Sequence, residues 1–207
     1  MSEKINLSFK PKQATKHLLS ILNKRGRDVV ESRYGLGPKS TRMTLDAIGK
    51  KYGITRERVR QIENHSVIAI RKSKEYKDTQ NIFSELKALI FELGGIISEK
   101  DLLKHLSKDP ATQNHINFLL VIGEEFKREK EDEEFKHRWH VDPELAKKIQ
   151  NAIRKLYSKL SDDELVLEGD LINNFLDEIK EVNEKYKNEE VIKRWLSISH
   201  KIGKNPL

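Results

Sequence analysis

The chain has no cysteine among its 207 residues, and it has only 10 glycines and 5 prolines. Without cysteine, disulfides, thiolate zinc sites, iron–sulfur clusters and cysteine nucleophiles are all excluded. No run approaches the ~20 apolar residues that span a bilayer. The N-terminal residues also lack the apolar segment of a signal peptide. These absences predict a cytoplasmic protein without membrane contact, and a nucleoid-associated one if its partner is DNA.

The residues that are abundant predict a mainly α fold. Lysine, glutamate, leucine and isoleucine dominate, and they are compatible with helices. Charged residues make up 35% of the chain and hydrophobic residues 36%. Because the apolar share is below the usual 45–50%, we expect several small cores rather than one large core.

The charge is distributed unevenly along the chain. Residues 1–80 contain 19 Lys and Arg against 8 Asp and Glu, whereas residues 81–207 contain 21 against 25. A basic segment followed by an acidic remainder points to a polyanionic partner for the basic part. A solvated basic surface is the alternative that charge alone leaves open.

The basic part contains the spacing of a helix-turn-helix. Thr44 is the expected N-cap of a short helix over 44–52, and Gly53 is the expected left-handed residue that ends it. Thr55 is then the expected N-cap of a longer helix over 56–74. A short helix, a tight glycine turn and a second helix are what this motif requires.

The helical period assigns faces to the second helix. Val59, Ile62 and Ala69 share the predicted inner face. The outer face combines arginine, glutamine and glutamate, which are the side chains that read base edges in the major groove. A basic amphipathic helix on a bundle, with its charges paired in solvent, is the alternative explanation.

Three segments carry a resemblance to a known family: RGRDVVESRYGLG at 25–37, TLDAIG at 44–49 and YGITRERVRQIE at 52–63. Together they resemble region 4 of bacterial primary sigma factors, over about residues 20–72. The string TRERVRQIE is long and specific. The chain lacks an aromatic cluster like that of sigma region 2, since Trp139 and Trp195 lie late and apart, and it continues far beyond residue 72.

The resemblance implies a function and a set of residues. The second helix would read the upstream, minus-thirty-five, element of a promoter-like DNA duplex, with Arg56, Glu57 and Gln61 as the base-reading residues. The apolar face of residues 12–33 would receive the beta flap of RNA polymerase core. The candidate phosphate-contacting or supporting residues are Arg58, Arg60, Asn64, Thr44, Leu45, Lys50, Lys51 and Arg42.

Beyond this segment the sequence predicts two further modules. Helices expected near 82–93, 99–106 and 112–122, followed by two short strands within 126–141, indicate a winged helix. The segment weakly resembles the winged-helix module of the polymerase delta subunit. An acidic run, 129–134, is expected to form a solvated wing tip. The predicted domains are therefore 1–78, helix-turn-helix; 79–142, winged-helix-like; and 143–207, a helical C-terminal segment that is truncated or partner-dependent.

No cofactor, metal or small-molecule substrate is expected. His137 and His140 lie three residues apart on a predicted strand, so they would point to opposite faces, and no third ligand is near. The phosphate-binding and nucleophile motifs of common enzymes are missing. A sigma-like DNA-binding regulator is therefore the leading hypothesis. A polymerase-binding adaptor or anti-sigma-like protein is the second, and a defence or mobile-element DNA-binding module is the third.

Overall fold

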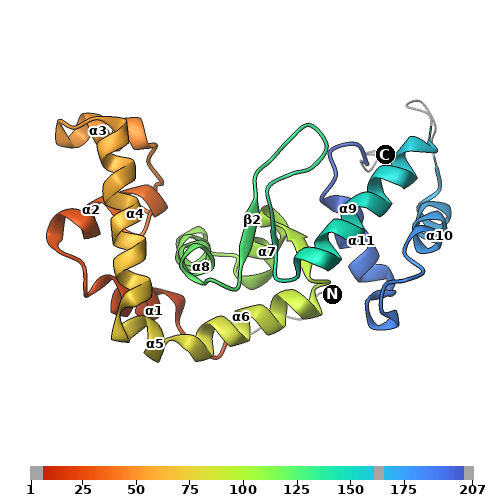
Figure 1. The fold of residues 1–207 in the computed structure, drawn as a ribbon, viewed down its shortest axis with the longest axis horizontal. Coiled ribbons are helices and arrows are strands. Elements are labelled where there is room, and N and C mark those ends of the chain that lie inside the picture. Colours follow the sequence, from red (N-terminus) through yellow and green to blue (C-terminus); the bar gives the residue numbers. More distant parts are fainter. Residues whose placement is uncertain (1–6, 161–165, 203–207) are drawn as a thin grey trace. The chain divides into compact units, whose positions relative to one another are not determined.

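The computed structural model describes residues 7–160 and 166–202. Within those residues it contains eleven α-helices, one 3-10 turn and a three-stranded sheet, which confirms the mainly α prediction (Figure 1). The chain divides into two compact units, 1–85 with 103–124, and 86–102 with 125–207. Each unit is described separately below. No helix within the described ranges combines the length and apolarity needed to cross a membrane.

The first unit contains the predicted helix-turn-helix. Its helices are α1 Pro11–Leu19, α2 Lys24–Tyr34, α3 Leu45–Tyr52, α4 Arg56–Lys72, α5 Lys74–Asp78 and α8 Pro110–Ile122. Helices α6 Gln80–Glu92 and α7 Glu99–Leu106 each begin in one unit and end in the other. Residues 75–80 belong mainly to α5 and the start of α6. Ser73 caps α5, because its hydroxyl accepts from the Tyr76 amide at 3.1 Å.

A short connection separates the first two helices. Helix α1 ends at Leu19 and α2 begins at Lys24, so the connection lies before Gly26. The Asn23 side chain caps α2 by accepting from the Gly26 amide at 2.8 Å. Gly26 has another role, because a Cβ there would lie 2.9 Å from the Ser66 hydroxyl of α4. The glycine therefore allows α2 to approach α4 closely.

Helix α8 packs into the first unit against α1 and α2, which the sequence analysis did not predict. Tyr34 of α2 meets Phe118 of α8 edge to face, with ring centroids 5.2 Å apart. Arg71 of α4 donates to the carbonyl oxygens of Ile122 and Val121 at 2.9 and 3.0 Å. These bonds satisfy carbonyl groups at the C-terminal end of α8 that have no partner within that helix.

This packing corrects the prediction that the apolar face of residues 12–33 is open to the beta flap. Leu18 and Leu19 of α1 are buried, at 0% and 4% exposure. Because α8 packs against α1 and α2, this part of the face has an intramolecular partner. The apolar face of α1 and α2 is therefore not entirely open to an external partner.

The second unit contains the small sheet of a winged-helix-like arrangement. Its strands are β1 Ile96–Ser98, β2 Lys127–Glu129 and β3 Arg138–His140, in the order β1-β3-β2 with antiparallel pairs. The hairpin of β2 and β3 confirms the two predicted strands, whereas β1 was not predicted. The three-residue β1 is buried throughout and shows no alternation of polar and apolar residues. Period-2 patterning therefore could not detect it.

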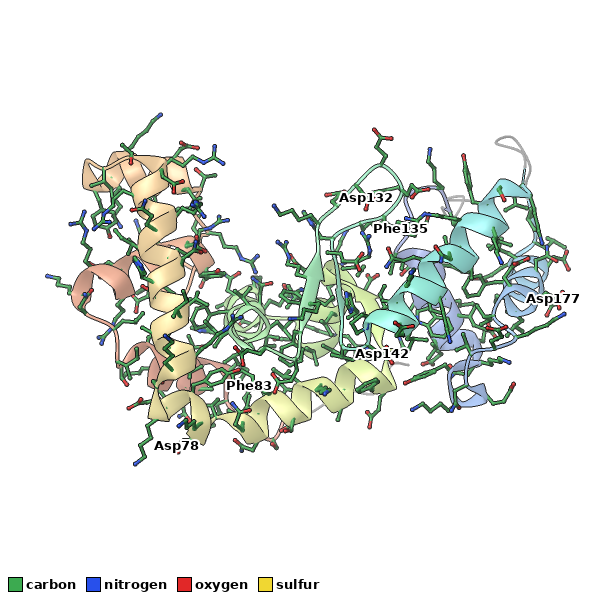
Figure 2. All side chains as sticks on the ribbon, in the orientation of Figure 1. Asp78, Phe83, Asp132, Phe135, Asp142 and Asp177 are labelled. Atoms are coloured by element: carbon green, nitrogen blue, oxygen red, sulfur yellow. The ribbon has the colours of Figure 1, made fainter. Side chains whose placement is uncertain are left out.

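The predicted acidic wing tip is exposed from Lys130 to Glu133, and ion pairs hold the two ends of the run. Glu129 pairs with Arg138 and with His140, and Glu134 pairs with Arg154 at 2.8 Å. The Glu134 carbonyl oxygen also accepts from the His200 amide at 2.8 Å. Asp132 and Phe135 lie on this segment (Figure 2). The acidic run therefore neutralises nearby cations within its own unit.

The C-terminal segment packs three helices on a core rich in aromatic residues. The elements are α9 Pro143–Ser158, α10 Glu168–Glu178, η1 Glu184–Tyr186 and α11 Glu189–Ser197. Phe175, Tyr186 and Trp195 are buried together, with Trp195 at 0% exposure. Val182, predicted within the second of these helices, lies in the connection after α10. The predicted chain end at 204–207 lies outside the described residues.

Candidate nucleic-acid interface

The helix-turn-helix is built on a small core between three helices. Val29 of α2, Ile48 of α3 and Val59 of α4 are each 1% exposed or less. Met43, Leu45, Tyr52, Ile54 and Ile62 pack around them and are partly buried. Ala69, expected on the same inner face, is exposed, and Ser66 and Ile70 are the buried residues of that turn. This core fixes the angle at which α4 presents its outer face.

Both helices of the motif begin with the predicted threonine cap. The Thr44 hydroxyl accepts from the Ala47 amide at 3.1 Å, and the Thr55 hydroxyl accepts from the Arg58 amide at 3.1 Å. Each cap satisfies one of the backbone donors that a helix start leaves without a partner. The two predicted helix starts are therefore confirmed.

Two glycines make the tight connection between the helices. Gly53 has φ of +65°, the left-handed conformation that ends α3, and a side chain would strain it. Gly49 is needed for a close approach, because a Cβ there would lie 2.6 Å from the Ile54 carbonyl oxygen. The Ile54 amide in turn donates to the Gly49 carbonyl at 3.0 Å. The connection between α3 and α4 therefore packs directly on the C-terminal part of α3.

All the predicted contact residues of α4 lie on its exposed surface. The exposed side chains of the first three turns are Arg56, Glu57, Arg58, Arg60, Gln61 and Asn64. They belong to the N-terminal half of α4, which follows α3 in the chain (Figure 1). Arginine, glutamine and glutamate on one rigid exposed face provide both donors and acceptors for base edges.

In the unbound protein, four of these side chains pair with one another. Arg60 donates to both Glu57 carboxylate oxygens, at 2.8 and 2.7 Å. This hydrogen bonding is the largest cause that lowers the pKa of Glu57 and raises the pKa of Arg60. Arg58 donates to the Gln61 side-chain oxygen at 3.1 Å. Exposed pairs of this kind are weak, so a ligand can replace them at small cost.

Helix α3, the first helix of the motif, carries two exposed lysines and one acidic residue in its first turn. Lys50 and Lys51 are exposed in the last turn of α3, and the Lys51 amine lies 4.9 Å from the Tyr52 ring centroid. Thr44 is exposed at the helix start, whereas Leu45 is half-buried in the core. Asp46 is also in the first turn. Its carboxylate opposes a phosphate at this helix start, so the α3 lysines are the stronger candidates for backbone contact.

Arg42 has a structural partner that the sequence analysis missed. Its Nε donates to the Asn114 side-chain oxygen of α8 at 2.7 Å. The Asn114 amide nitrogen donates to the carbonyls of Gly35 and Ser40, at 3.1 and 2.8 Å. A buried side chain of α8 therefore holds the loop between α2 and α3. No local signal predicted this contact, because it joins residues 72 to 79 positions apart.

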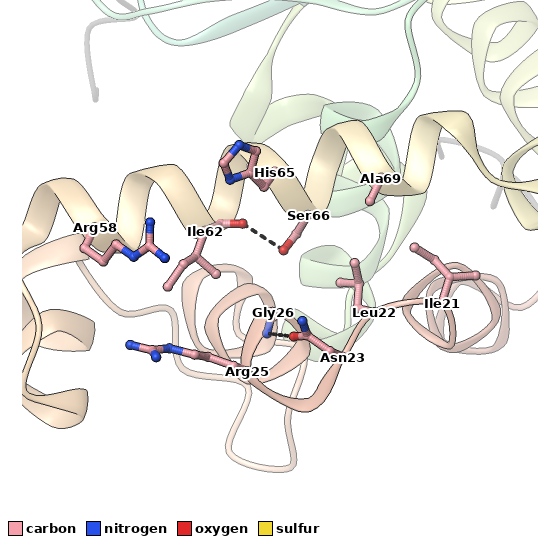
Figure 3. A pocket seen from close by; sticks show the side chains of 10 residues that line it. All are labelled: Ile21, Leu22, Asn23, Arg25, Gly26, Arg58, Ile62, His65, Ser66 and Ala69. Atoms are coloured by element: carbon pink, nitrogen blue, oxygen red, sulfur yellow. Dashed lines mark hydrogen bonds between the residues drawn. The ribbon is translucent and has the colours of Figure 1, made fainter.

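A groove lies beside the motif, between the α1–α2 junction and α4 (Figure 3). Its volume is about 340 Å³. Ile21, Leu22, Ile62 and Ala69 supply apolar lining. The ionisable side chains along it are Arg25, Arg58 and His65. The groove thus combines apolar lining with cationic groups, and no carboxylate lines it.

Comparison with known proteins gives one family match. Residues 18–72 match the family described as Sigma-70, region 4. The chain is 40% identical over 55 residues to RNA polymerase principal sigma factor HrdD of Streptomyces viridifaciens, covering 27% of this chain and 16% of that protein. It is 40% identical over 70 residues to RNA polymerase sigma factor SigA of a Bacillus species, covering 32% and 18%.

The chain therefore spans less than a fifth of the length of these relatives. No solved structure matches it significantly. The matched residues include α2, α3 and α4 and the end of α1, so the family match falls on the helix-turn-helix of the first unit. The resemblance to region 4 of primary sigma factors, predicted from about residues 20–72, is thereby confirmed.

Proposed function

We propose that the chain is a sequence-specific DNA-binding regulator of the sigma-factor type, which recognises a promoter-like duplex through α4. The main support is the exposed row on α4, held on a rigid core within the segment that matches Sigma-70, region 4. We assign base reading to Arg56, Glu57 and Gln61. Side chains that contact base edges in the major groove must be exposed on the same part of the recognition helix.

The remaining residues of the motif position the protein on the duplex and do not read the base sequence. Lys50, Lys51 and Arg58 neutralise phosphates, and Arg60 and Asn64 support the readers. Phosphate contacts set the orientation of the protein on the duplex and much of its affinity. Arg42 has a supporting role, because its hydrogen bond to Asn114 connects the loop between α2 and α3 to α8. The protein then acts in the cytoplasm, on the nucleoid, as a binding protein rather than an enzyme.

We further propose that RNA polymerase core contacts the groove through its beta flap. Helix α8 packs on much of α1 and α2, whereas the groove between the α1–α2 junction and α4 has an open apolar lining. The same groove favours the second candidate function, a polymerase-binding adaptor that has no specific DNA binding of its own.

Selection of bound duplexes from a random pool, with and without polymerase core, tests these proposals. The double variant Arg56→Ala, Gln61→Ala and the single variant Ala69→Glu are run beside the unchanged chain. Ala69 is exposed, so the substitution alters the groove without entering the core. We expect a single enriched motif that is lost in the double variant only, and polymerase retention that is lost in Ala69→Glu only. If duplexes are enriched only when polymerase core is present, the chain does not recognise DNA independently. That result overturns the first proposal and favours the polymerase-binding adaptor.

A further inference from the structure

Helix α9 of the second unit carries a row of cations on its solvent face. The exposed basic residues of this helix and its C-cap are Lys147, Lys148, Arg154, Lys155 and Lys159. Glu144, in the first turn, is the one exposed acidic side chain of the helix. This concentration of positive charge lies in the part of the sequence where acidic residues are in excess, 25 against 21 basic from residue 81 onward.

Two of the five cations already have acidic partners. Arg154 pairs with Glu134 at 2.8 Å, and Lys159 pairs with Glu178. Among the described residues, Lys147, Lys148 and Lys155 form no ion pair. The hydrogen bond from Lys159 is the largest cause that lowers the pKa of Glu178, and the nearby charge of Lys155 lowers it further. Lys155 therefore shares its charge with Glu178, whereas the charges of Lys147 and Lys148 are available to an external anion.

The opposite face of α9 holds the row in place. Leu145, Ile149, Ile153 and Leu156 are 8% exposed or less and belong to the core of the second unit. Since a helix rises 1.5 Å per residue, Lys147 and Lys155 lie about 12 Å apart along it. One strand of B-DNA carries a phosphate for each ~3.4 Å of its axis. A row of this length therefore corresponds to about three to four such intervals along the duplex axis.

A pocket adjoins the N-terminal half of the row. It has a volume of about 310 Å³ and is lined in part by Lys147, Arg154 and the β3 residues Arg138 and His140. Glu129 also lines it, but its carboxylate pairs with Arg138 and with His140. Lys127 of β2 stands opposite His140 in the antiparallel register, so its side chain leaves the sheet on the same side as that of His140. Lys127 is exposed on that side of the sheet, and it is not part of the pocket lining.

We infer that the α9 row, defined as Lys147, Lys148 and Lys155, is a second contact surface for the phosphate backbone of duplex DNA. The inference deepens the proposed function, because it adds sequence-independent affinity to the base reading assigned to α4. Lysines suit this role, since they neutralise phosphates as compact charges without demanding a fixed geometry.

The character of the surface favours a nucleic acid over an acidic membrane. A helix that binds a bilayer needs exposed apolar side chains beside its cations. The large hydrophobic residues that are exposed in the described ranges are Ile68 and Leu167, and neither lies on α9. A predominantly cationic face without large exposed apolar side chains is complementary to a phosphate backbone instead.

The test uses the full chain and a mixed-sequence DNA duplex, with affinity measured at several salt concentrations. The triple variant Lys147→Gln, Lys148→Gln, Lys155→Gln removes three charges from α9. A matched control, Lys100→Gln, Lys180→Gln, Lys185→Gln, removes three exposed charges from other elements of the same unit. We expect the α9 variant to bind more weakly and to reduce the slope of log K against log salt by about two to three. The control keeps the original slope, and thermal melting confirms that both variants fold.

The outcomes separate this inference from the proposed function. An unchanged slope in the α9 variant, or an equal loss in the control, overturns the inference. If that happens while Arg56→Ala, Gln61→Ala abolishes sequence preference, the proposed function stands alone. If the α9 variant loses affinity and the α4 variant changes nothing, the inference stands and the proposed function fails. An unchanged chain that binds no duplex overturns both, and binding of the α9 row to anionic vesicles alone overturns the choice of partner.

Discussion

Gln61 is a single side chain whose removal tests the proposed sequence preference of the candidate interface. Its oxygen accepts from Arg58 in the unbound protein, and its side chain is exposed. Gln61→Ala removes from α4 the group that we propose to read adenine, and it leaves the core intact. We expect a loss of roughly 1–3 kcal/mol on the selected duplex, together with relaxed preference at one base pair. Affinity measured for the selected duplex and for the three other base pairs at that position checks this result. An equal loss on random duplexes contradicts the assignment.

His115 provides a prediction of pH dependence at the same scale. It is buried in α8 at 6% exposure. Burial, with a smaller contribution from Lys12, lowers its pKa below the ordinary value of 6.5, and Asp109 opposes the shift. The unfolded chain therefore binds the proton more readily than the folded chain. The stability is complete above pH 6.5, and it falls as the pH drops from 6.5 towards the lower folded pKa.

Denaturant titrations between pH 7.5 and pH 5 test this expectation. His115→Gln has no ionisable group at the position, so its free energy of unfolding should fall less over this range than that of the unchanged chain. His17→Gln, which changes an exposed histidine of α1, is the control. Equal acid sensitivity of the unchanged chain and His115→Gln contradicts the assignment.

Among the elements, the helix-turn-helix was predictable because its signals are local. Thr44, Gly53 and Thr55 mark both ends of α3 and the start of α4 within twelve residues, and each acts as expected. The packing of α8 was not predictable. Its burial extends over the continuous run from Asn114 to Leu120, so no periodic face indicated a partner. Arg42, Asn114 and Arg71 meet their partners over 50 to 79 residues. Residue types and spacing alone do not reveal such contacts.

The turn between α3 and α4 provides a prediction about an element. In Gly49→Ala the new Cβ meets the Ile54 carbonyl oxygen, a backbone atom that cannot rotate away. We expect a loss of roughly 1–3 kcal/mol of stability from this overpacking, with weaker specific DNA binding because α4 is displaced. Gly37→Ala is the matched control, since a Cβ there meets nothing within 4 Å. Chemical denaturation and duplex binding of both variants provide the measurement.

Helix α8 can be tested through Phe118, which is 0% exposed and packs on Tyr34. Phe118→Ala is expected to destabilise the first unit by roughly 3–5 kcal/mol. Val121→Ala, at a half-buried position on the same helix, should cost clearly less. Thermal melts give the stabilities, and hydrogen exchange of the α1 and α2 amides locates the effect. Full protection of these amides in Phe118→Ala would show that α8 is not needed for their stability.

For the whole molecule, the uneven charge predicts a strong dependence of DNA binding on salt. The net charge of +7 conceals the excess of 11 basic residues in residues 1–80. Lys50→Ala or Lys51→Ala is expected to weaken all duplexes alike and to flatten the salt slope by about one if the lysine contacts a phosphate. Asp46→Asn is the opposite control, because it removes the first-turn anion of α3 and should strengthen binding. Binding that is independent of salt contradicts a phosphate contact.

The first unit is made of two separate stretches of the chain, 1–85 and 103–124. Asn114 lies 79 residues after Gly35, whose carbonyl oxygen it binds. At a synthesis rate of about 5–20 residues per second, this interval corresponds to roughly 4–16 seconds. Helices α1 and α2 therefore leave the ribosome well before α8 exists, with Leu18 and Leu19 not yet covered by it. The newly made chain has a short period in which a chaperone can bind this apolar surface, and the arrival of α8 ends that period.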